Sequence, residues 1–279
     1  MRAFNYSCPT DLAEAVKLLR AEPDAKLVAG GQTLLASLKL RLAAPSRLVD
    51  LRLVPKLQTI SGNDKEIEIG AMSSHADVAV SPIVAARIPA LAQLAGGIGD
   101  RMVRNMGTLG GSIANNDPAA DYPAAVLALN AGIITTTRCI PAAEFFLGMF
   151  ETALQPDEIV VAVRFPVPRR AAYVKFRHPA SRFALTGVFV AETAEGSRVV
   201  VTGAGPNVFR VPAMESALDR DFSPTALTGI TVAAAELSTD LHASAEYRAN
   251  LIRVLAERAV AAALGEAPIY NPDGQHRSQ

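Results

Sequence analysis

The chain has 279 residues, of which 50% are hydrophobic and 19% are charged, and its formal net charge is zero. This length supports a well-buried core and two or three subdomains, and this composition is ordinary for a soluble globular protein. The sequence lacks the basic stripe of nucleic-acid-binding proteins, an apolar run long enough to span a membrane, and a signal-peptide core at its N-terminus. We therefore expect a cytoplasmic protein with no nucleic-acid partner and no membrane span.

Residues 1–55 have the pattern of a compact β-α-β unit. Strands are expected at residues 4–6, 26–29 and 47–51, and helices at residues 12–21 and 34–42. The pair Thr10-Asp11 offers an N-cap to the first helix, and Gly30-Gly31 ends the second strand. We expect this segment to form an N-terminal subdomain.

Residues 56–168 combine alternating segments with short helical ones. Strands are expected at residues 67–71, 133–137 and 158–166, and helices at residues 76–80, 90–95, 124–130 and 141–150. Ser81-Pro82 is typical of a helix start, and Asp121 stands where it can cap the helix at 124–130. We expect a second subdomain here, ending after Pro166.

The pattern changes around Arg169-Arg170. Residues 173–177, 188–193 and 199–203 are expected to form a three-stranded antiparallel sheet, followed by helices at 225–236 and 245–263. The polar tail from Pro268 is expected to be irregular or mobile. These patterns predict an α+β fold with boundaries near residues 55 and 168, the third domain comprising residues 169–279.

The segment 101–123 shows neither a helical nor a strand period. Its small and polar residues include Gly107, Thr108, Gly110, Gly111, Ser112, Asn115 and Asn116. Glycines let the backbone bend and approach another group closely, and hydroxyls and amides offer hydrogen bonds without net charge. A second segment of this kind, residues 27–34, contains Gly30-Gly31-Gln32-Thr33.

Two such segments are suited to hold one anionic cofactor between them. Consecutive backbone N–H groups form an anion site without lysine or arginine, and helix N-termini add a positive dipole. A pyrophosphate suits two opposed segments, which points to a dinucleotide. Gly203-Ala204-Gly205 fails the Rossmann pattern at Val208, and no Walker lysine is present. Taken alone, either segment is more often a simple turn.

The cysteines and histidines do not have the spacing of a metal site. Cys8 and Cys139 lie far apart and form neither a Cys-x-x-Cys pair nor a larger thiolate set. The histidines, which lack His-Glu-x-x-His spacing, are His75, His178, His242 and His276. We expect no metal on this chain and assign these residues structural or surface roles.

The two glycine segments carry a family resemblance. Ala29-Gly30-Gly31-Gln32-Thr33-Leu34 and Asn105-Met106-Gly107-Thr108-Leu109-Gly110-Gly111-Ser112 together resemble the paired FAD-binding motifs of one family. It is the flavoprotein (medium) subunit of the molybdenum hydroxylases, such as aerobic carbon monoxide dehydrogenase and bacterial xanthine dehydrogenase. The resemblance covers nearly the whole chain, including residues 48–52, 69–73, 157–160 and 245–248, and the motif pair is highly specific.

The resemblance implies a fold like that of the vanillyl-alcohol-oxidase/PCMH (VAO/PCMH) flavoproteins, with two FAD-binding subdomains and a C-terminal α+β domain. It implies a non-covalently bound FAD. The implied cofactor contacts are Val28, Ala29, Gly30, Gly31, Gln32, Thr33, Leu34, Ala71, Ile98, Gly107, Thr108, Gly111, Ser112, Asn115, Asp121, Val160, Arg177 and Phe183. Among them, Asp121 hydrogen-bonds the cofactor, Val160 and Arg177 touch the isoalloxazine, and Phe183 covers it.

Two of these positions depart from the family pattern. Arg177 stands where a lysine is common, which keeps the charge but changes its reach. Phe183 stands where the carbon monoxide enzymes carry tyrosine, so this position offers no hydroxyl.

The resemblance further implies an oxidoreductase subunit that transfers electrons and has no catalytic acid or base of its own. Electrons would pass from molybdopterin on a large subunit, through [2Fe–2S] clusters on a small subunit, to the FAD and then to NAD, a quinone or a cytochrome. The expected complex is a dimer of heterotrimers. The substrate, whether carbon monoxide, an aldehyde, a purine or an N-heterocycle, would be selected elsewhere.

Two alternatives stay open from the sequence. One is a self-sufficient FAD oxidase of the same fold. Such an enzyme needs a catalytic base, and no cluster of His, Glu or Tyr residues in the sequence indicates one. The other is a non-catalytic nucleotide-binding or assembly module.

Overall fold

The computed structural model describes residues 1–266 and confirms the N-terminal β-α-β unit. Its strands β1 (Asn5–Ser7), β2 (Lys26–Val28) and β3 (Arg47–Asp50) are parallel in the order β1–β3–β2. Helix α1 (Leu12–Ala21) packs its apolar face on this sheet, and α2 (Leu34–Lys39) follows the first glycine segment. The second helix ends before the predicted Leu42 because Arg41 adopts a left-handed φ of 61°.

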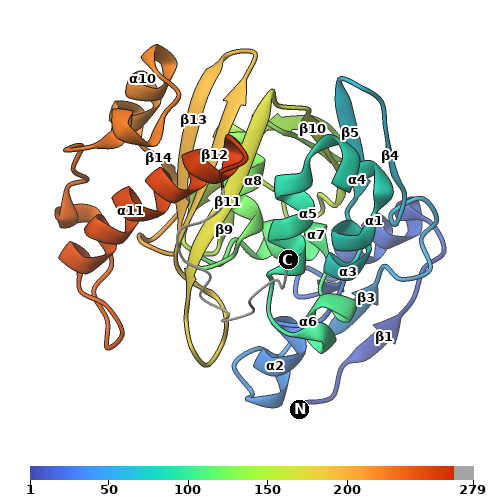
Figure 1. The fold of residues 1–279 in the computed structure, drawn as a ribbon. Coiled ribbons are helices and arrows are strands. Elements are labelled where there is room, and N and C mark those ends of the chain that lie inside the picture. The colour runs from blue at the N-terminus through green and yellow to red at the C-terminus, as the bar shows by residue number, and fades with distance from the viewer. Residues whose placement is uncertain (267–279) are drawn as a thin grey trace.

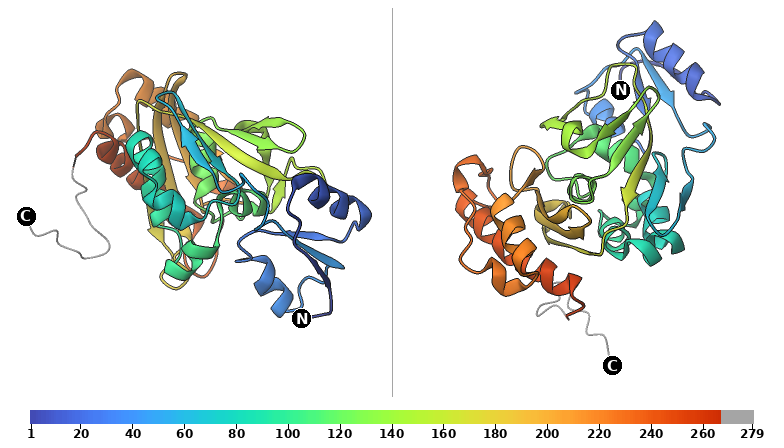
Figure 2. Two further views of the ribbon diagram at one scale, coloured as in Figure 1. Left: turned by 90° about the vertical axis from the view of Figure 1, so that its right-hand side faces the viewer. Right: turned by 90° about the horizontal axis from the view of Figure 1, so that it is seen from above.

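A five-stranded antiparallel sheet has the order β4–β5–β10–β6–β7, and its strands β4, β5 and β10 are seen at the upper right in Figure 1. Its strands are β4 (Ile60–Gly62), β5 (Glu66–Gly70), β6 (Gly132–Thr135), β7 (Cys139–Pro141) and β10 (Val160–Pro166). The helices of this part are α3 (His75–Val80), α4 (Pro82–Arg87), α5 (Pro89–Gly96), α6 (Arg101–Met106), α7 (Leu109–Asn115) and α8 (Tyr122–Ala128). The N-terminal unit and the C-terminal helices lie on opposite sides of this central part (Figure 2).

The segment 101–123, whose sequence shows neither a helical nor a strand period, contains the two short helices α6 and α7. Each starts at a side-chain cap: Asp100 accepts from the N–H of Val103, and Thr108 accepts from the N–H of Gly111. Helices of six and seven residues are too short to show an apolar period, which is why the pattern missed them.

The predicted helix at residues 141–150 is wrong beyond its first turn. Helix α9 (Ala142–Phe145) passes directly into a hairpin of β8 (Phe146–Gly148) and β9 (Glu151–Thr152). The tip reverses at Phe150, whose φ is 56°. The hairpin is held by Asn116, whose amide donates to the backbone oxygens of Gly148 and Glu151 at 2.7 and 2.9 Å.

The C-terminal sheet has four strands, so the predicted three-stranded sheet is corrected. Its order is β11 (Arg170–Arg177), β12 (Ala184–Thr193), β13 (Gly196–Thr202) and β14 (Phe209–Arg210), all antiparallel. The added strand has two residues and cannot show alternation. Helices α10 (Pro212–Arg220) and α11 (Ala245–Ala263) pack on the sheet (Figure 1).

The predicted helix at 225–236 is absent. The chain forms two 3₁₀ turns there, η1 (Pro224–Leu227) and η2 (Ala234–Glu236). Between them Gly229 takes a φ of 81°, and the β-branched run at 230–232 disfavours a helix. The predicted irregular tail from Pro268 lies outside the described residues.

Strand β12 is buried on both faces and joins two cores. Val188 and Val190 pack with the C-terminal helices, whereas Phe189 and Ala191 belong to the core of the central part. Since side chains alternate along a strand, this one strand forms a wall of both cores. Within residues 1–266 no helix has the length and apolarity required for a membrane span.

Candidate cofactor-binding site

The two glycine segments, far apart in sequence, lie in contact. A Cβ atom on Gly30 would stand 2.1 Å from the backbone oxygen of Met106 and 2.7 Å from the Cα of Gly107. A Cβ on Gly110 would stand 2.5 Å from the Cβ of Ala71. Only glycine permits these approaches: the first brings the two segments together, and the second packs segment 101–123 against Ala71.

A cavity of about 490 Å³ lies between them, within the size range of cofactor sites. Its lining includes every predicted contact residue except Val28 and Arg177. Val28 is buried in β2, behind the first glycine segment. Arg177 lies beside Gly97: a Cβ atom built on Gly97 would be 3.6 Å from the guanidinium of Arg177.

The segments differ in the donors that they can offer a ligand. From Gly30 to Thr33, no backbone N–H finds a hydrogen-bond acceptor within residues 1–266. The N–H groups of residues 109–111 are used internally, by the backbone oxygens of Ser73 and Ala71 and by the Thr108 hydroxyl. An anion would therefore be bound mainly by the first segment, while the second contributes hydroxyl and amide side chains.

Asp121 occupies the cavity wall in a way that the sequence did not predict. It stands at the N-cap position of α8, but its side chain caps nothing. Instead its carboxylate accepts from Lys175 at 2.8 Å and from the Tyr173 hydroxyl at 2.5 Å. The Asp121 and Lys175 side chains are 3% and 4% exposed, so this is a buried ion pair. Burial raises the pKa of the Asp121 carboxyl, and the Lys175 ammonium opposes that shift.

Sequence reasoning missed Tyr173 and Lys175, although a signal was available. Residues 173–177 were predicted to be a strand, and residues two apart on a strand share a face. That period places Tyr173, Lys175 and Arg177 together. The lysine also donates to the backbone oxygen of Arg182 at 3.1 Å, which ties the loop bearing Phe183 to the ion pair.

His75 is a second residue that sequence reasoning did not place in the site. Its ring lines the cavity, packs against Tyr122 at 5.3 Å between ring centres, and stands where a Cβ on Gly107 would be. Burial lowers the pKa of His75 to about 4, with a further contribution from Arg104. Its Nδ1 atom has no hydrogen-bond partner, so the neutral ring serves as packing for the second glycine segment.

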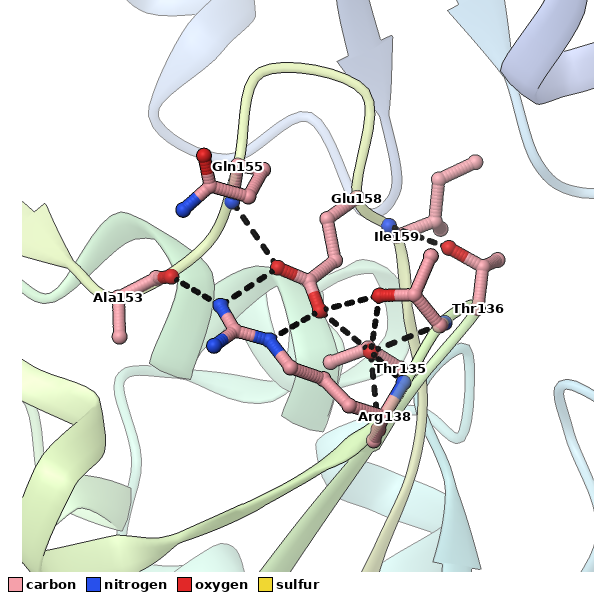
Figure 3. A network of polar contacts seen from close by, with 8 residues as sticks. Thr135, Thr136, Arg138, Ala153, Gln155, Glu158 and Ile159 are labelled. Carbon is pink, nitrogen blue, oxygen red and sulfur yellow. Dashed lines mark hydrogen bonds and ion pairs between the residues drawn. The ribbon is translucent and has the colours of Figure 1, made fainter.

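Glu158 anchors the turn that forms another part of the cavity wall (Figure 3). One carboxylate oxygen accepts from Arg138, Thr135 and Thr137 at 2.9, 2.6 and 2.8 Å. The other accepts from Arg138 and from the backbone N–H of Gln155, both at 3.0 Å. These donors, Arg138 first, hold the pKa of Glu158 well below its usual range. The network fixes the loop that positions Ile159 and Val160.

The residues present fit a bound dinucleotide such as FAD. The first segment offers free N–H groups for a pyrophosphate, and both glycine segments line the same cavity of about 490 Å³. Apolar side chains for a planar ring line the same cavity, namely Ile98, Leu154, Val160 and Phe183.

Comparison with known proteins places the chain in one group. Residues 2–168 match the family model described as the FAD binding domain in molybdopterin dehydrogenase. The chain is 35% identical to the carbon monoxide dehydrogenase medium chain of Hydrogenophaga pseudoflava, covering 93% of this chain and 96% of that one. It is also 35% identical to the nicotine 6-hydroxylase medium subunit of Paenarthrobacter nicotinovorans, covering 92% and 96%.

Solved structures agree with these sequence relatives. Carbon monoxide dehydrogenase from Hydrogenophaga pseudoflava superposes with a TM-score of 0.86 at 34% identity, covering 95% of this chain and 98% of that chain. Quinoline 2-oxidoreductase from Pseudomonas putida 86 superposes with a TM-score of 0.85 at 29% identity, again covering 95% and 98%.

Proposed function

The chain belongs to the FAD-binding medium subunits of the molybdenum hydroxylases, and on that premise we propose that the cavity between its glycine segments holds the FAD through which it transfers electrons. The contact between Gly30 and the backbone at Met106–Gly107 is the observation that carries this proposal. It joins the two motifs around one cavity.

The structure suggests a division of labour among the lining residues. The N–H groups of residues 30–33 would bind the pyrophosphate, and Ser112 and Asn115 would hydrogen-bond neighbouring polar groups. Ile98, Val160 and Phe183 would pack against the isoalloxazine. When bound, FAD supplies reversible one- and two-electron transfer; the protein supplies position and local charge.

The Asp121–Lys175 pair would set the charge beside the cofactor. Lys175 opposes the rise that burial causes in the pKa of this carboxyl group, and Tyr173 orients the group through a hydrogen bond of 2.5 Å. A preorganised carboxylate of this kind can accept a hydrogen bond from the ligand without moving.

A self-sufficient oxidase is not favoured, because the two buried carboxylates in the cavity wall are engaged by cations and the lowered pKa of His75, about 4, makes its ring a weak base. Asp121 and Glu158 are held by cations, and burial keeps His75 neutral. None is a free base positioned for substrate.

The remaining parts of the proposal concern the whole complex. Its relatives are named as medium chains or subunits of larger enzymes. We propose a molybdopterin-binding large subunit and a [2Fe–2S] small subunit as partners, assembled as a dimer of heterotrimers in the cytoplasm. We also propose the VAO/PCMH-like arrangement, with FAD-binding subdomains at 1–55 and 56–168 and a C-terminal domain at 169–279.

FAD uptake by the full-length chain tests the cavity assignment. We expect the purified chain to retain FAD after gel filtration and to show flavin absorbance. Gly30→Ala should weaken FAD binding by about tenfold or more, because the added Cβ overlaps a backbone oxygen at 2.1 Å. Fluorescence titration of the stripped protein measures this.

Gly96→Ala is the matched control, because its Cβ would meet only Ala79 at an ordinary 3.7 Å. Equal affinity in both variants would contradict the shared cavity. A chain that takes up no FAD would contradict the function.

With the molybdenum and iron–sulfur subunits added, the substrate of the complex should reduce the flavin and remove its visible absorbance. In the chain alone, the flavin should stay oxidised.

A further inference from the structure

One loop in the wall of the proposed FAD cavity is held by the C-terminal sheet. This loop, residues 117–121, lies between α7 and α8 and lines the cavity with Asp117, Ala120 and Asp121. The side chains that hold it come from β11 and β13, the two strands on either side of β12 (Figure 1). Both strands lie beyond the matched FAD-binding domain, so the placement of Asp121 depends on a part of the chain outside that domain.

The backbone of this loop is fixed by Thr202, a residue at the end of β13 that is 1% exposed. The Thr202 hydroxyl donates to the backbone oxygen of Ala120 at 2.6 Å and lies 3.0 Å from that of Pro118. The backbone N–H of Gly203 donates to the same Pro118 oxygen at 2.8 Å. Since the residues before Asp121 are tied to β13, the groups that bind its side chain decide where the carboxyl group points.

Tyr173 reaches Asp121 through a space that glycine at position 187 leaves open. A Cβ on Gly187 would stand 2.3 Å from the Tyr173 hydroxyl oxygen, and 3.0 Å from Cζ of Tyr173 and from Cγ2 of Thr202. The φ of Gly187 is outside the left-handed region, so the backbone of β12 does not itself require glycine here. The Tyr173 ring packs against buried Phe189 at 6.1 Å between ring centres. A methyl group at position 187 would therefore displace the Tyr173 hydroxyl from its 2.5 Å hydrogen bond to Asp121.

The Tyr173 hydroxyl is a lasting donor to this carboxyl group. Burial, with a further contribution from Asp121, raises the pKa of Tyr173 well above its usual value, so the hydroxyl keeps its proton. It donates to Oδ1 of Asp121, while the Lys175 ammonium lies 2.8 Å from Oδ1 and 3.0 Å from Oδ2. The carboxyl group is thus held by two donors from β11.

We propose that Gly187 and Tyr173 are positioning residues for FAD binding; this rests on the proposed function. Gly187 leaves room for the Tyr173 hydroxyl, and the hydroxyl fixes the orientation of the Asp121 carboxyl group in the cavity wall. Neither Gly187 nor Tyr173 lines the cavity, so both act on the ligand through Asp121. A carboxyl group held in place beforehand loses little freedom when the ligand binds.

Fluorescence titration of the stripped full-length chain with FAD tests this role. Tyr173→Phe should weaken FAD binding by about tenfold, because Asp121 loses the hydrogen bond that orients it. Gly187→Ala should weaken binding to a similar degree. Adding Gly187→Ala to Tyr173→Phe should cost less than about a further twofold, because the atom closest to the new Cβ is gone.

A second background shows whether the effect passes through the carboxyl group. The Asp121→Ala, Lys175→Met double variant removes that group without leaving an unpaired buried charge. Tyr173→Phe in this background should change FAD affinity by less than about twofold. A merely structural role of the tyrosine would weaken FAD binding in both backgrounds alike.

Two matched controls should bind FAD as the parent chain does. Tyr247→Phe removes an exposed hydroxyl on α11. Gly205→Ala adds a Cβ to another buried glycine of the C-terminal domain, at an ordinary 3.4 Å from Phe209.

Three results would overturn the proposal: parent-like FAD affinity in Tyr173→Phe, additive effects of Tyr173→Phe and Gly187→Ala, or an equal loss in the background without the carboxyl group. Tyr173→Phe adds no atom, so it decides the matter if Gly187→Ala does not fold. A parent chain that takes up no FAD would overturn the proposed function and this role with it. A parent chain that binds FAD, with a Tyr173→Phe variant that binds it equally well, would overturn the role of these two residues alone.

Discussion

His75 packs a neutral imidazole under the second glycine segment, and this burial makes the stability of the chain depend on pH. Burial lowers the pKa of the ring to about 4 in the folded chain, against about 6.5 in the unfolded chain. The unfolded chain therefore binds the proton more readily between these values. The contribution of His75 to stability is complete above pH 6.5 and is lost as the pH falls towards 4.

We expect lowering the pH from 7 to 5 to reduce the free energy of unfolding by about 2 kcal/mol through His75. Urea unfolding at both pH values measures the change. The His75→Gln variant, which has no titrating group there, should lose correspondingly less between pH 7 and 5. An identical pH dependence in the two proteins would show that the ring is protonated in the folded state.

The buried Asp121–Lys175 pair leads to a second expectation. Lys175→Met should destabilise the chain by about 3–5 kcal/mol, because it leaves a buried carboxylate without its cation. Adding Asp121→Asn should restore a large part of that loss. Lys65→Met, on an exposed lysine, should change stability by less than about 0.5 kcal/mol. Urea unfolding compares the three, and an additive double mutant would argue against the pairing.

Individual residues show what the sequence could reveal about the site. The glycines were found because backbone approach demands them, and the structure places Gly30 and Gly107 in contact. The strand period could have placed Lys175 on the same face as Arg177, but its pairing with Asp121, 54 positions away, leaves no local pattern. The assignment of Asp121 as a helix cap was wrong because its oxygens are already bonded to β11.

At the scale of the element, Glu158 shows how one carboxylate fixes a turn. Five hydrogen bonds converge on it from Thr135, Thr137, Arg138 and Gln155. Because its folded pKa is lowered, its stabilisation is present above the unfolded value of about 4.3 and is lost as the pH falls below that.

We expect Glu158→Gln to lower the free energy of unfolding at pH 7 by about 2 kcal/mol, since the amide cannot replace a charged acceptor for Arg138. The difference from the parent protein should shrink as the pH falls below 4. Denaturant titrations at pH 7 and 3.5 measure it. A gap of the same size at both pH values would show that the carboxylate is not what holds the turn.

Long, strongly patterned elements were predictable and short ones were not. The strand around Val163 and the helix 245–263 were found from apolar periodicity alone. The two-residue β14, the α9–β8 junction and the 3₁₀ turns near Gly229 depend on tertiary contacts and left-handed backbone. No window of sequence contains the tertiary contacts, whereas Gly229 and the β-branched run at 230–232 were a local signal against the predicted helix.

At the scale of the whole molecule, the double burial of β12 links the central and C-terminal parts. A fragment ending at residue 168 would expose the apolar surface that Phe189, Ala191 and Val200 cover. We expect such a fragment to aggregate, and the full chain to unfold the two parts in one calorimetric transition. A soluble, cooperatively folded 1–168 fragment would contradict this.

The same strand decides where the molecule can move. Phe183 directly precedes β12, which is clamped from both faces and cannot shift without disturbing two cores. A shift of the Phe183 backbone would therefore be confined to the six residues of the β11–β12 loop, where Arg182 already has a φ of 61°. A rearrangement of this loop would change where Phe183 lies at the wall of the proposed FAD cavity and leave both hydrophobic cores in place.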